Sequence, residues 1–253
     1  MSFNVTADAY AQFMGRYAEP LAVQFAELAG VRAGQRSLDV GCGPGALTAQ
    51  LVERLGADAV SAIDPSESFV AAVQSRLPGV DVRSGVAEEL PYPDDSFDVA
   101  LAQLVVHFMT DPVAGLAEMR RVTRAGGVVA ACVWDHAGGA GPLSLFWQAV
   151  HDVDAAAPGE AGLAGARGGH LAELAEAAGL TRIHSTTLTV RVTYATFDEW
   201  WWPFTLGVGP AGAYLSKHDD AEGERLRARC AELQPSAPFE VSGTAWSVLA
   251  RVP

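Results

Sequence analysis

The sequence has little lysine, few cysteines and no long apolar run. Its 17 basic residues include a single lysine, Lys217, and they face 30 acidic residues, which gives a formal net charge of −13. A nucleic-acid partner is therefore not expected, because neutralising phosphates needs a basic face. The nearest approach to a basic cluster is a helix-like run that we interpret as a solvated face, with Arg120, Arg121 and Arg124.

The three cysteines are too few and too far apart for a disulfide framework or a zinc site. No metal is expected. No apolar run approaches the ~20 residues of a membrane span, and the N-terminus carries no basic stretch followed by an apolar segment. We therefore expect a cytoplasmic protein with no membrane partner, and the composition, 49% hydrophobic and 19% charged, allows one large core.

Short apolar runs alternate with helical patterns over the first half of the chain. An initial helix is expected over 7–29. This alternation is typical of βαβ units with a parallel sheet covered on both faces. The expected strands are 36–40, 59–63, 80–84, 97–102 and 127–134, and the expected helices lie near 45–56, 66–77 and 111–123.

The pattern changes from about residue 141. A stretch rich in Gly and Ala predicts a loop, and a strongly β-forming segment follows later. The expected elements are a loop over 155–170, a helix over 170–178, a strand over 182–194, an aromatic cluster over 197–204, a helix over 218–233 and a closing strand over 246–252.

Polar and glycine residues follow the expected strands, where open parallel sheets bind ligands. The first strand leads into the turn GCGPG, Gly41 to Gly45, whose glycines let the backbone approach a ligand. Asp64 follows the second strand, about 20 residues past the turn, and is placed to accept hydrogen bonds from ribose hydroxyls. Gln103 and His107 follow the fourth strand, and Trp134 and His136 lie at the end of the fifth.

The glycine turn alone does not decide the ligand, because GCGPGA also satisfies the nicotinamide-dinucleotide fingerprint. Asp39 stands two residues before Gly41, where dinucleotide enzymes usually carry an apolar residue. The compact G-x-G-x-G turn also suits a nucleoside better than a pyrophosphate.

Five motifs occur in one order: LDVGCGPG, AIDPS, GVAEELPYPDDSFD, the HFMTDP segment and RVTRAGGVV. With them the sequence resembles the class I S-adenosylmethionine-dependent methyltransferases, in particular the small bacterial enzymes similar to the ubiquinone and menaquinone biosynthesis methyltransferases. Ala125 stands where the family's R-x-x-x-P-G-G turn has proline. The resemblance implies an α/β fold: a Rossmann-like, seven-stranded, mostly parallel sheet with helices on both faces, an antiparallel last strand and a helical lid.

The resemblance also divides the chain, which we expect to be a single methyltransferase domain over 1–253. Its parts would be an N-terminal helical cap over 1–30, a cofactor-binding core over 31–194, a lid or substrate insertion over 195–238 and a final strand over 239–253.

Cofactor contacts are implied by the same resemblance. Asp39 and the backbone from Gly41 to Gly43 would hold the methionine end, and Asp64 the ribose. The family often has Asp at position 86, so Val86 removes a contact to the adenine amino group that a backbone group, Glu88 or water must replace. Arg16 would pair with the cofactor carboxylate, and Pro65 would pack on the adenine. The full set of implied cofactor residues is Arg16, Asp39, Gly41, Cys42, Gly43, Gly45, Asp64, Pro65, Val86, Ala87, Glu88 and Gln103.

Methyl transfer from a sulfonium is an in-line displacement that needs alignment and exclusion of water. A hydroxyl or ammonium acceptor also needs a base. His107 is the first candidate, because the family often has a histidine just past the fourth strand, and His136 is the second; a core or capping histidine is the alternative for both. The expected substrate residues are His107, Trp134, Trp201, Trp202 and Phe204, although three consecutive tryptophans cannot all face one way and a core role stays open.

The sequence thus predicts an S-adenosylmethionine-dependent methyltransferase that acts on a small, aromatic or apolar metabolite and releases S-adenosylhomocysteine. The charge balance disfavours polyanionic acceptors. A Rossmann-type nicotinamide-dependent oxidoreductase is one alternative, although the sequence has no Tyr-x-x-x-Lys motif and Lys217 lies far from the strand exits. A non-catalytic cofactor-binding module of the same fold is the other, with Val86 and Ala125 in its favour. The acceptor atom and the oligomeric state are not predicted.

Overall fold

The computed structural model describes residues 6–253. Its strands form a single seven-stranded sheet. The strand order is β3-β2-β1-β4-β5-β7-β6. The first five strands are parallel to one another, and β7 runs antiparallel to both of its neighbours. The predicted Rossmann-like sheet with an antiparallel last strand is confirmed. The strands are β1 (Ser37–Val40), β2 (Val60–Asp64), β3 (Asp81–Ser84), β4 (Phe97–Gln103), β5 (Thr123–Trp134), β6 (Thr181–Tyr194) and β7 (Phe239–Arg251).

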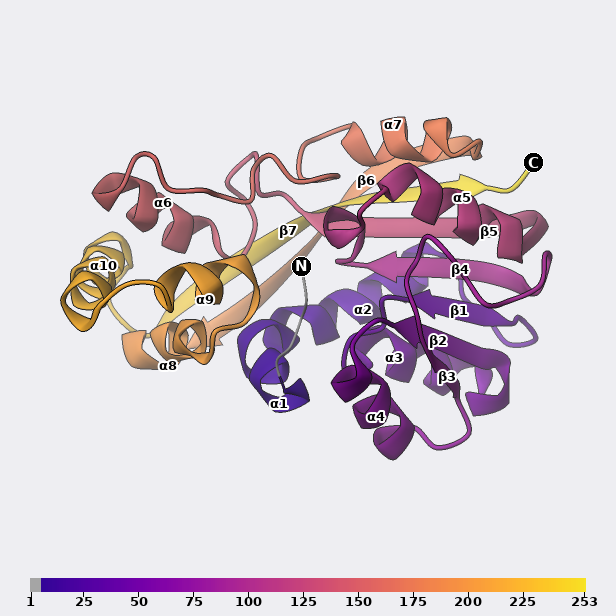
Figure 1. Cartoon of the computed structure of the whole chain (residues 1–253), viewed down its shortest axis with the longest axis horizontal. Coiled ribbons are helices and arrows are strands. Elements are labelled where there is room, and N and C mark those ends of the chain that lie inside the picture. Colours follow the sequence, from indigo (N-terminus) through magenta and orange to yellow (C-terminus); the bar gives the residue numbers. More distant parts are fainter. Residues whose placement is uncertain (1–5) are drawn as a thin grey trace.

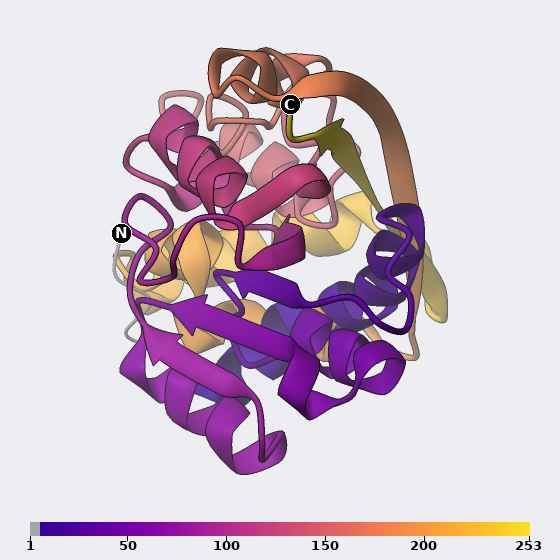
Figure 2. The same ribbon diagram turned by 90° about the vertical axis from the view of Figure 1, so that its right-hand side faces the viewer.

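Helices cover both faces of the sheet, as predicted (Figures 1 and 2). Alternate residues of each strand serve the two faces: Leu38 and Val40 pack in the core under α5 and α7, whereas Val99 and Leu101 pack in the core under α2 and α3. Both faces are apolar, which explains why the strands read as continuous apolar runs. The helices are α2 (Arg16–Leu28), α3 (Ala46–Leu55) and α4 (Glu67–Arg76) on one face, and α5 (Pro112–Val122) and α7 (His170–Ala177) on the other.

The N-terminal helical segment is interrupted, which the sequence did not predict. A short α1 (Ala7–Tyr10) passes into a π-helical turn, Ala11–Gly15, before α2 begins. A π-helical turn holds an extra residue, so it changes the direction of the side chains beside it. Phe13 and Met14 lie in this turn and are buried.

Four helices gather at one end of the molecule, beyond the end toward which the β4 arrow points (Figure 1). One of them, α6, was not predicted, because no element is assigned between the strand expected over 127–134 and the loop expected over 155–170. The residue pattern predicts a closing strand over 246–252 only, which is too short, whereas the final strand over 239–253 that the resemblance implies starts where β7 does; β7 begins at Phe239 and pairs with nearly all of β6. The helices are α6 (Ser144–Val153), α8 (Phe197–Trp201), α9 (Gly209–Leu215) and α10 (Asp220–Leu233). The last three form the insertion between β6 and β7, and its role as a lid stays a prediction.

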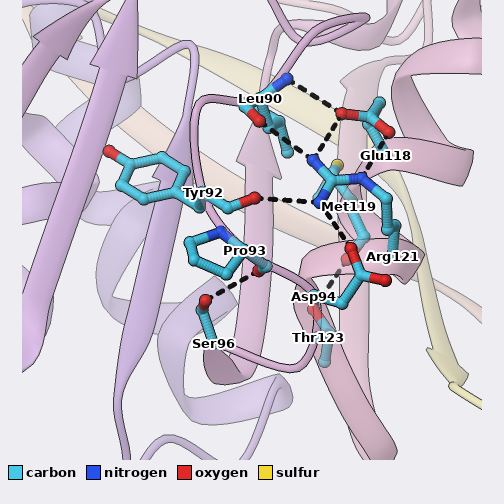
Figure 3. Close-up of polar contacts among 9 residues, drawn as sticks. All are labelled: Leu90, Tyr92, Pro93, Asp94, Ser96, Glu118, Met119, Arg121 and Thr123. Carbon is cyan, nitrogen blue, oxygen red and sulfur yellow. Dashed lines mark hydrogen bonds and ion pairs between the residues drawn. The ribbon is translucent and has the colours of Figure 1, made fainter.

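Arg121 of α5 holds the segment between β3 and β4 against the helix (Figure 3). Its guanidinium donates to the carbonyl oxygens of Leu90 and Tyr92 at 2.9 and 2.8 Å and to the carboxylate of Asp94 at 2.8 Å. Glu118 accepts from Arg121 and also from the Leu90 backbone N–H at 3.0 Å. The prediction of a solvated basic face is therefore wrong for Arg121.

Candidate functional site

The glycine turn after β1 places backbone without side chains at the carboxyl ends of the strands. Gly41, Gly43 and Gly45 have φ values of +68°, +53° and +94°, a region that glycine adopts without strain. A Cβ on Gly41 would lie 2.4 Å from Cγ2 of Val105, so this part of the turn packs directly against the exit of β4. A Cβ on Gly43 would meet nothing within 4 Å. The turn is thus packed on one side and open on the other.

Asp64, the last residue of β2, fixes the shape of this turn. Its carboxylate accepts from the backbone N–H of Gly43 at 2.8 Å and of Ser66 at 2.9 Å. Burial raises the pKa of Asp64, while the two backbone donors oppose that shift. Each carboxylate oxygen can accept more than one hydrogen bond, so Asp64 can still receive ribose hydroxyls.

Asp39 lies deeper, at 1% exposure, and accepts from the hydroxyl of Thr48 at 2.6 Å. Burial is the main cause that raises the pKa of Asp39 to about 7, and the charge of Asp64 adds to it. A cation bound beside Asp39 would reverse this shift, because an opposite charge favours the ionised carboxylate.

A pocket opens beside the glycine turn, and its lining brings together five of the predicted cofactor residues, Asp39, Gly41, Cys42, Gly43 and Gln103. Its lining includes Gln103, whose side-chain N–H donates to the carbonyl oxygen of Ala18 at 3.0 Å. The other amide atom, Oε1, is buried without a partner in the described structure. Buried polar atoms are normally paired, so this oxygen is available to a ligand donor. The pocket is lined by Tyr10, Ala18, Asp39, Gly41, Cys42, Gly43, Pro44, Ala46, Leu47, Gln103 and Leu104.

We call this pocket the cofactor pocket, and its hydrogen-bond acceptors fit S-adenosylmethionine. A buried carboxylate and an unpaired amide oxygen suit an ammonium and a sulfonium. Asp64 is not in the lining, but it accepts from Gly43 of the turn, and its carboxylate suits ribose hydroxyls. Burial raises the pKa of the Cys42 thiol well above its usual value, so Cys42 is a neutral wall of the pocket.

Two predicted cofactor residues have other partners. The Arg16 guanidinium donates to Glu199 at 2.6 Å, lies 5.1 Å from the centre of the Tyr194 ring and is absent from the lining of the cofactor pocket. The Glu88 carboxylate accepts from the backbone N–H groups of Thr110 and Asp111, at 2.7 and 3.2 Å. The structure therefore does not bring Arg16 to the pocket, and it uses Glu88 to hold the start of α5.

Beside Glu88, Val86 is 45% exposed and Ala87 is buried. Pro65 is exposed just past Asp64. These three residues lie after β2 and β3, at the edge where an adenine ring is expected.

A second pocket, the acceptor pocket, adjoins the cofactor pocket and shares Tyr10 and Leu104 with it. Leu104 follows β4 directly and has a φ of +61°, a conformation that costs free energy for a residue with a Cβ. Such strain concentrates at functional sites. The acceptor pocket is lined by Tyr10, Phe13, Met14, Leu104, His107, Phe108, Trp134, His136, Leu143, Glu160, Val208, Gly209 and Pro210.

His107 and His136 meet in this pocket, with ring centres 5.9 Å apart. Nδ1 of His107 and Nε2 of His136 are buried and have no partner among the described residues. Burial is the main cause that lowers the pKa of His107 to about 3 and that of His136 to about 4. Both rings are therefore neutral at pH 7, and because such low pKa values make them weak bases, they suit hydrogen bonding to a substrate better than proton abstraction.

Glu160 is the one carboxylate among the described residues of this pocket, and the sequence analysis missed it. It is 4% exposed and comes from the segment predicted only as a loop. One carboxylate oxygen accepts from Nε1 of Trp147 at 2.6 Å, and the other lies 4.0 Å from Nε2 of His136. Burial raises the pKa of Glu160 to about 7. The one available signal was that Glu160 is the only acid between Asp154 and Glu173.

The aromatic residues predicted at the substrate site do not all lie in the acceptor pocket. Trp134 lines the acceptor pocket, and its Nε1 is buried without a described partner. Trp201 and Phe204 are buried behind the pocket, where Phe204 stacks on Phe146 with ring centres 4.5 Å apart. Trp202 is 50% exposed and lines none of the pockets described above.

Within residues 6–253, no group of His, Cys, Asp and Glu is arranged to hold a metal ion. No helix in that range is both long and apolar enough to cross a membrane.

Comparison with known proteins places part of this chain in a family. Residues 38–131 match the methyltransferase domain family. A demethylmenaquinone methyltransferase of Beutenbergia cavernae is 41% identical over 98 residues, which are 39% of this chain and 40% of that enzyme. Matches of this kind span about two fifths of the relatives' length.

Solved structures agree over nearly the whole chain. A methyltransferase from an antibiotic biosynthesis pathway of Anabaena variabilis superposes with a TM-score of 0.62 at 19% identity, covering 90% of this chain and 96% of the other. Phosphoethanolamine N-methyltransferase 2 of Haemonchus contortus, in complex with phosphomonomethylethanolamine and S-adenosylhomocysteine, gives 0.61 at 18% identity, covering 98% of this chain and 57% of that one. The chain has the Rossmann-like fold of the class I methyltransferases, and within it residues 38–131 match the methyltransferase domain family.

Proposed function

We propose that this protein is an S-adenosylmethionine-dependent methyltransferase acting on a small, largely apolar acceptor. The observation that carries the proposal is the adjacency of two different pockets that share Tyr10 and Leu104. One pocket offers carboxylates and glycine backbone at the strand exits, and the other offers apolar walls with a few unpaired polar atoms. Direct transfer between two bound molecules requires such an arrangement.

The cofactor pocket would hold S-adenosylmethionine, which supplies an activated methyl group on a sulfonium. Asp39 and the free Oε1 of Gln103 would receive the ammonium end, and Asp64 the ribose hydroxyls. Val86 and Pro65 would flank the adenine. Tyr10 closes this pocket from the N-terminal helix, and its own ring packs edge-on against Phe69 of α4 at 5.4 Å.

The acceptor pocket would orient its ligand and exclude water. Phe13, Met14 and Val208 close the pocket from segments that are distant in sequence. His107 and His136 would hold the acceptor by hydrogen bonds as neutral rings. The in-line geometry that this supplies is worth up to ~7 to 11 kcal/mol in well-oriented systems.

Isothermal titration calorimetry tests the cofactor assignment directly. We expect S-adenosylhomocysteine to bind at submillimolar concentration and NAD not to bind. Asp64→Asn should weaken S-adenosylhomocysteine binding about tenfold or more, because a charged acceptor is lost. Asp58→Asn, at an exposed position, is the matched control and should leave the affinity unchanged.

A preference for NAD over S-adenosylhomocysteine would overturn the assignment, and so would an Asp64→Asn variant that binds as well as the parent. Transfer itself is tested by incorporation of labelled methyl groups into candidate acceptors. Absence of transfer to every acceptor class despite cofactor binding would favour the non-catalytic alternative.

A further inference from the structure

The acceptor pocket holds one buried group that can carry a negative charge and no positive group to pair with it. Its lining contains Glu160 but neither lysine nor arginine. Burial lowers the pKa of His107 and of His136 and raises the pKa of the Tyr10 phenol, so all three side chains are neutral at pH 7. An unpaired buried charge is costly, so a ligand that supplies the missing positive charge gains from the pairing.

The geometry around Glu160 leaves a place for one donor atom. Trp147 fixes one carboxylate oxygen at 2.6 Å, which aligns the carboxylate. The other oxygen and Nε2 of His136 are 4.0 Å apart, too far for a direct hydrogen bond. An atom about 2.8 Å from each fits between them at ordinary hydrogen-bond length. With the His136 proton on Nδ1, Nε2 of His136 and the free oxygen of Glu160 are both acceptors. An atom between them must therefore donate one hydrogen bond to each.

We propose that Glu160 and His136 bind the ammonium group of the methyl acceptor, so that the substrate class is a small cationic amine with an apolar or aromatic body. The inference rests on the proposed function, because it names the substrate class of that site. An ammonium donates to both flanking atoms and neutralises the carboxylate. A neutral hydroxyl has a single hydrogen and leaves the charge unpaired, and a carboxylate or phosphate is repelled.

The rest of the pocket suits the body of such a molecule. Most of its walls are apolar, with Phe13, Phe108 and Leu143 among them. A one-ring or two-ring amine would bury its hydrocarbon part there while its charged end reaches Glu160.

Calorimetry with matched ligands tests the inference without any need for turnover. The probes are 2-phenylethylamine, 2-phenylethanol and 3-phenylpropionate, with the corresponding naphthyl series, each titrated at pH 8 with and without saturating S-adenosylhomocysteine. We expect at least one amine to bind at least tenfold more tightly than its alcohol, and the acids not to bind.

Variants of Glu160 separate charge from shape. Glu160→Gln keeps an oxygen for Trp147 but removes the charge, so the preference for the amine over the alcohol should disappear. Glu160→Asp keeps the charge and should keep the order of affinities. Glu176→Gln, on the exposed side of α7, is the control and should behave as the parent.

Two results would overturn the inference: no amine in either series binds more tightly than its alcohol, or Glu160→Gln retains the preference. The proposed function is read out separately, by S-adenosylhomocysteine binding to the same samples. Amine preference without cofactor binding would refute the proposed function alone, and cofactor binding without amine preference would refute only the substrate class.

Discussion

The two pockets are built in different ways, although they share a wall. In the cofactor pocket and the turn beside it, both carboxylates have partners in the protein, while Gln103 Oε1 has none: Asp39 accepts from Thr48, nine residues on, and Asp64 accepts from Ser66 and Gly43. In the acceptor pocket the lining comes from segments between residues 10 and 210, and several polar atoms have no partner in the described structure.

This difference indicates where specificity lies. A site whose polar atoms are already held by its own backbone is rigid and suits one ligand shared by a whole family. A site with unpaired buried atoms is incomplete until a particular ligand supplies the partners, and it rejects ligands that do not. We therefore expect substitutions in the cofactor pocket to change the fold and cofactor affinity together, and those in the acceptor pocket to change ligand preference.

The largest effect is expected from Gly41→Ala. The new Cβ would lie 2.4 Å from Val105 Cγ2, at a φ of +68°. Overpacking and the left-handed conformation together cost about 3 to 5 kcal/mol, and cofactor binding should be lost. The measurement is urea denaturation with calorimetry of S-adenosylhomocysteine binding.

Gly43→Ala is the matched control for that variant, because φ is also positive but nothing lies within 4 Å of the new Cβ. It should cost only about 1 kcal/mol. Adding Val105→Ala should restore part of the stability that Gly41→Ala loses. Equal losses in the two single variants would show that the turn is not packed against the β4 exit.

An effect of opposite sign, with a pH dependence, is expected from Asp39→Asn. Burial raises the pKa of Asp39 to about 7 in the folded protein, above its ordinary value of 3.8. The unfolded chain therefore loses its proton first, and stability falls as the pH rises from about 4 to 7. The amide that replaces the carboxyl cannot ionise, so the cofactor-free variant should be more stable than the parent by about 4 kcal/mol at pH 8 and nearly equal at pH 4.

The measurement is urea denaturation of both proteins at the two pH values, with S-adenosylhomocysteine affinity at pH 8. The variant should bind the cofactor more weakly despite its greater stability. A stability difference that is the same at both pH values would contradict the role of burial at Asp39.

The contrast between the pockets also explains what the sequence could reveal. The turn from Gly41 to Gly45 and the acid after β2 were predicted because their chemistry is local: glycine permits the turn, and the strand end places the carboxylate. The start of the helix expected near 111–123 depends on equally local chemistry, since Asp111 accepts from the Ala114 N–H at 3.0 Å. Such features need only neighbours in the chain.

Features that depend on distant partners were missed. Glu160 stands among Gly and Ala residues, and only the fold brings it to Trp147 and His136. The π-helical turn that buries Phe13 and Met14 has no sequence signature that we could identify. The residue pattern alone predicts only the second half of β7, because the first half carries Glu240, Ser242 and Gly243, which are weak strand formers until β6 pairs with them.

The smallest effect is expected at Arg16, where the resemblance and the structure disagree. The resemblance implies a contact with the cofactor carboxylate, whereas the structure pairs Arg16 with Glu199, 183 residues away. The two side chains are 39% and 34% exposed, so solvent screens the pair. Arg16→Ala should therefore cost at most about 0.5 kcal/mol of stability and leave S-adenosylhomocysteine affinity unchanged.

Glu199→Ala gives the complementary measurement, because it frees the guanidinium without removing it. If Arg16 contacts only Glu199, both variants bind S-adenosylhomocysteine like the parent. A tenfold loss of affinity in Arg16→Ala alone would mean that Arg16 leaves Glu199 when the cofactor binds. The N-terminal helix would then join the cofactor pocket only in the bound state, and the contrast between a preformed pocket and an incomplete one would no longer hold at its methionine end.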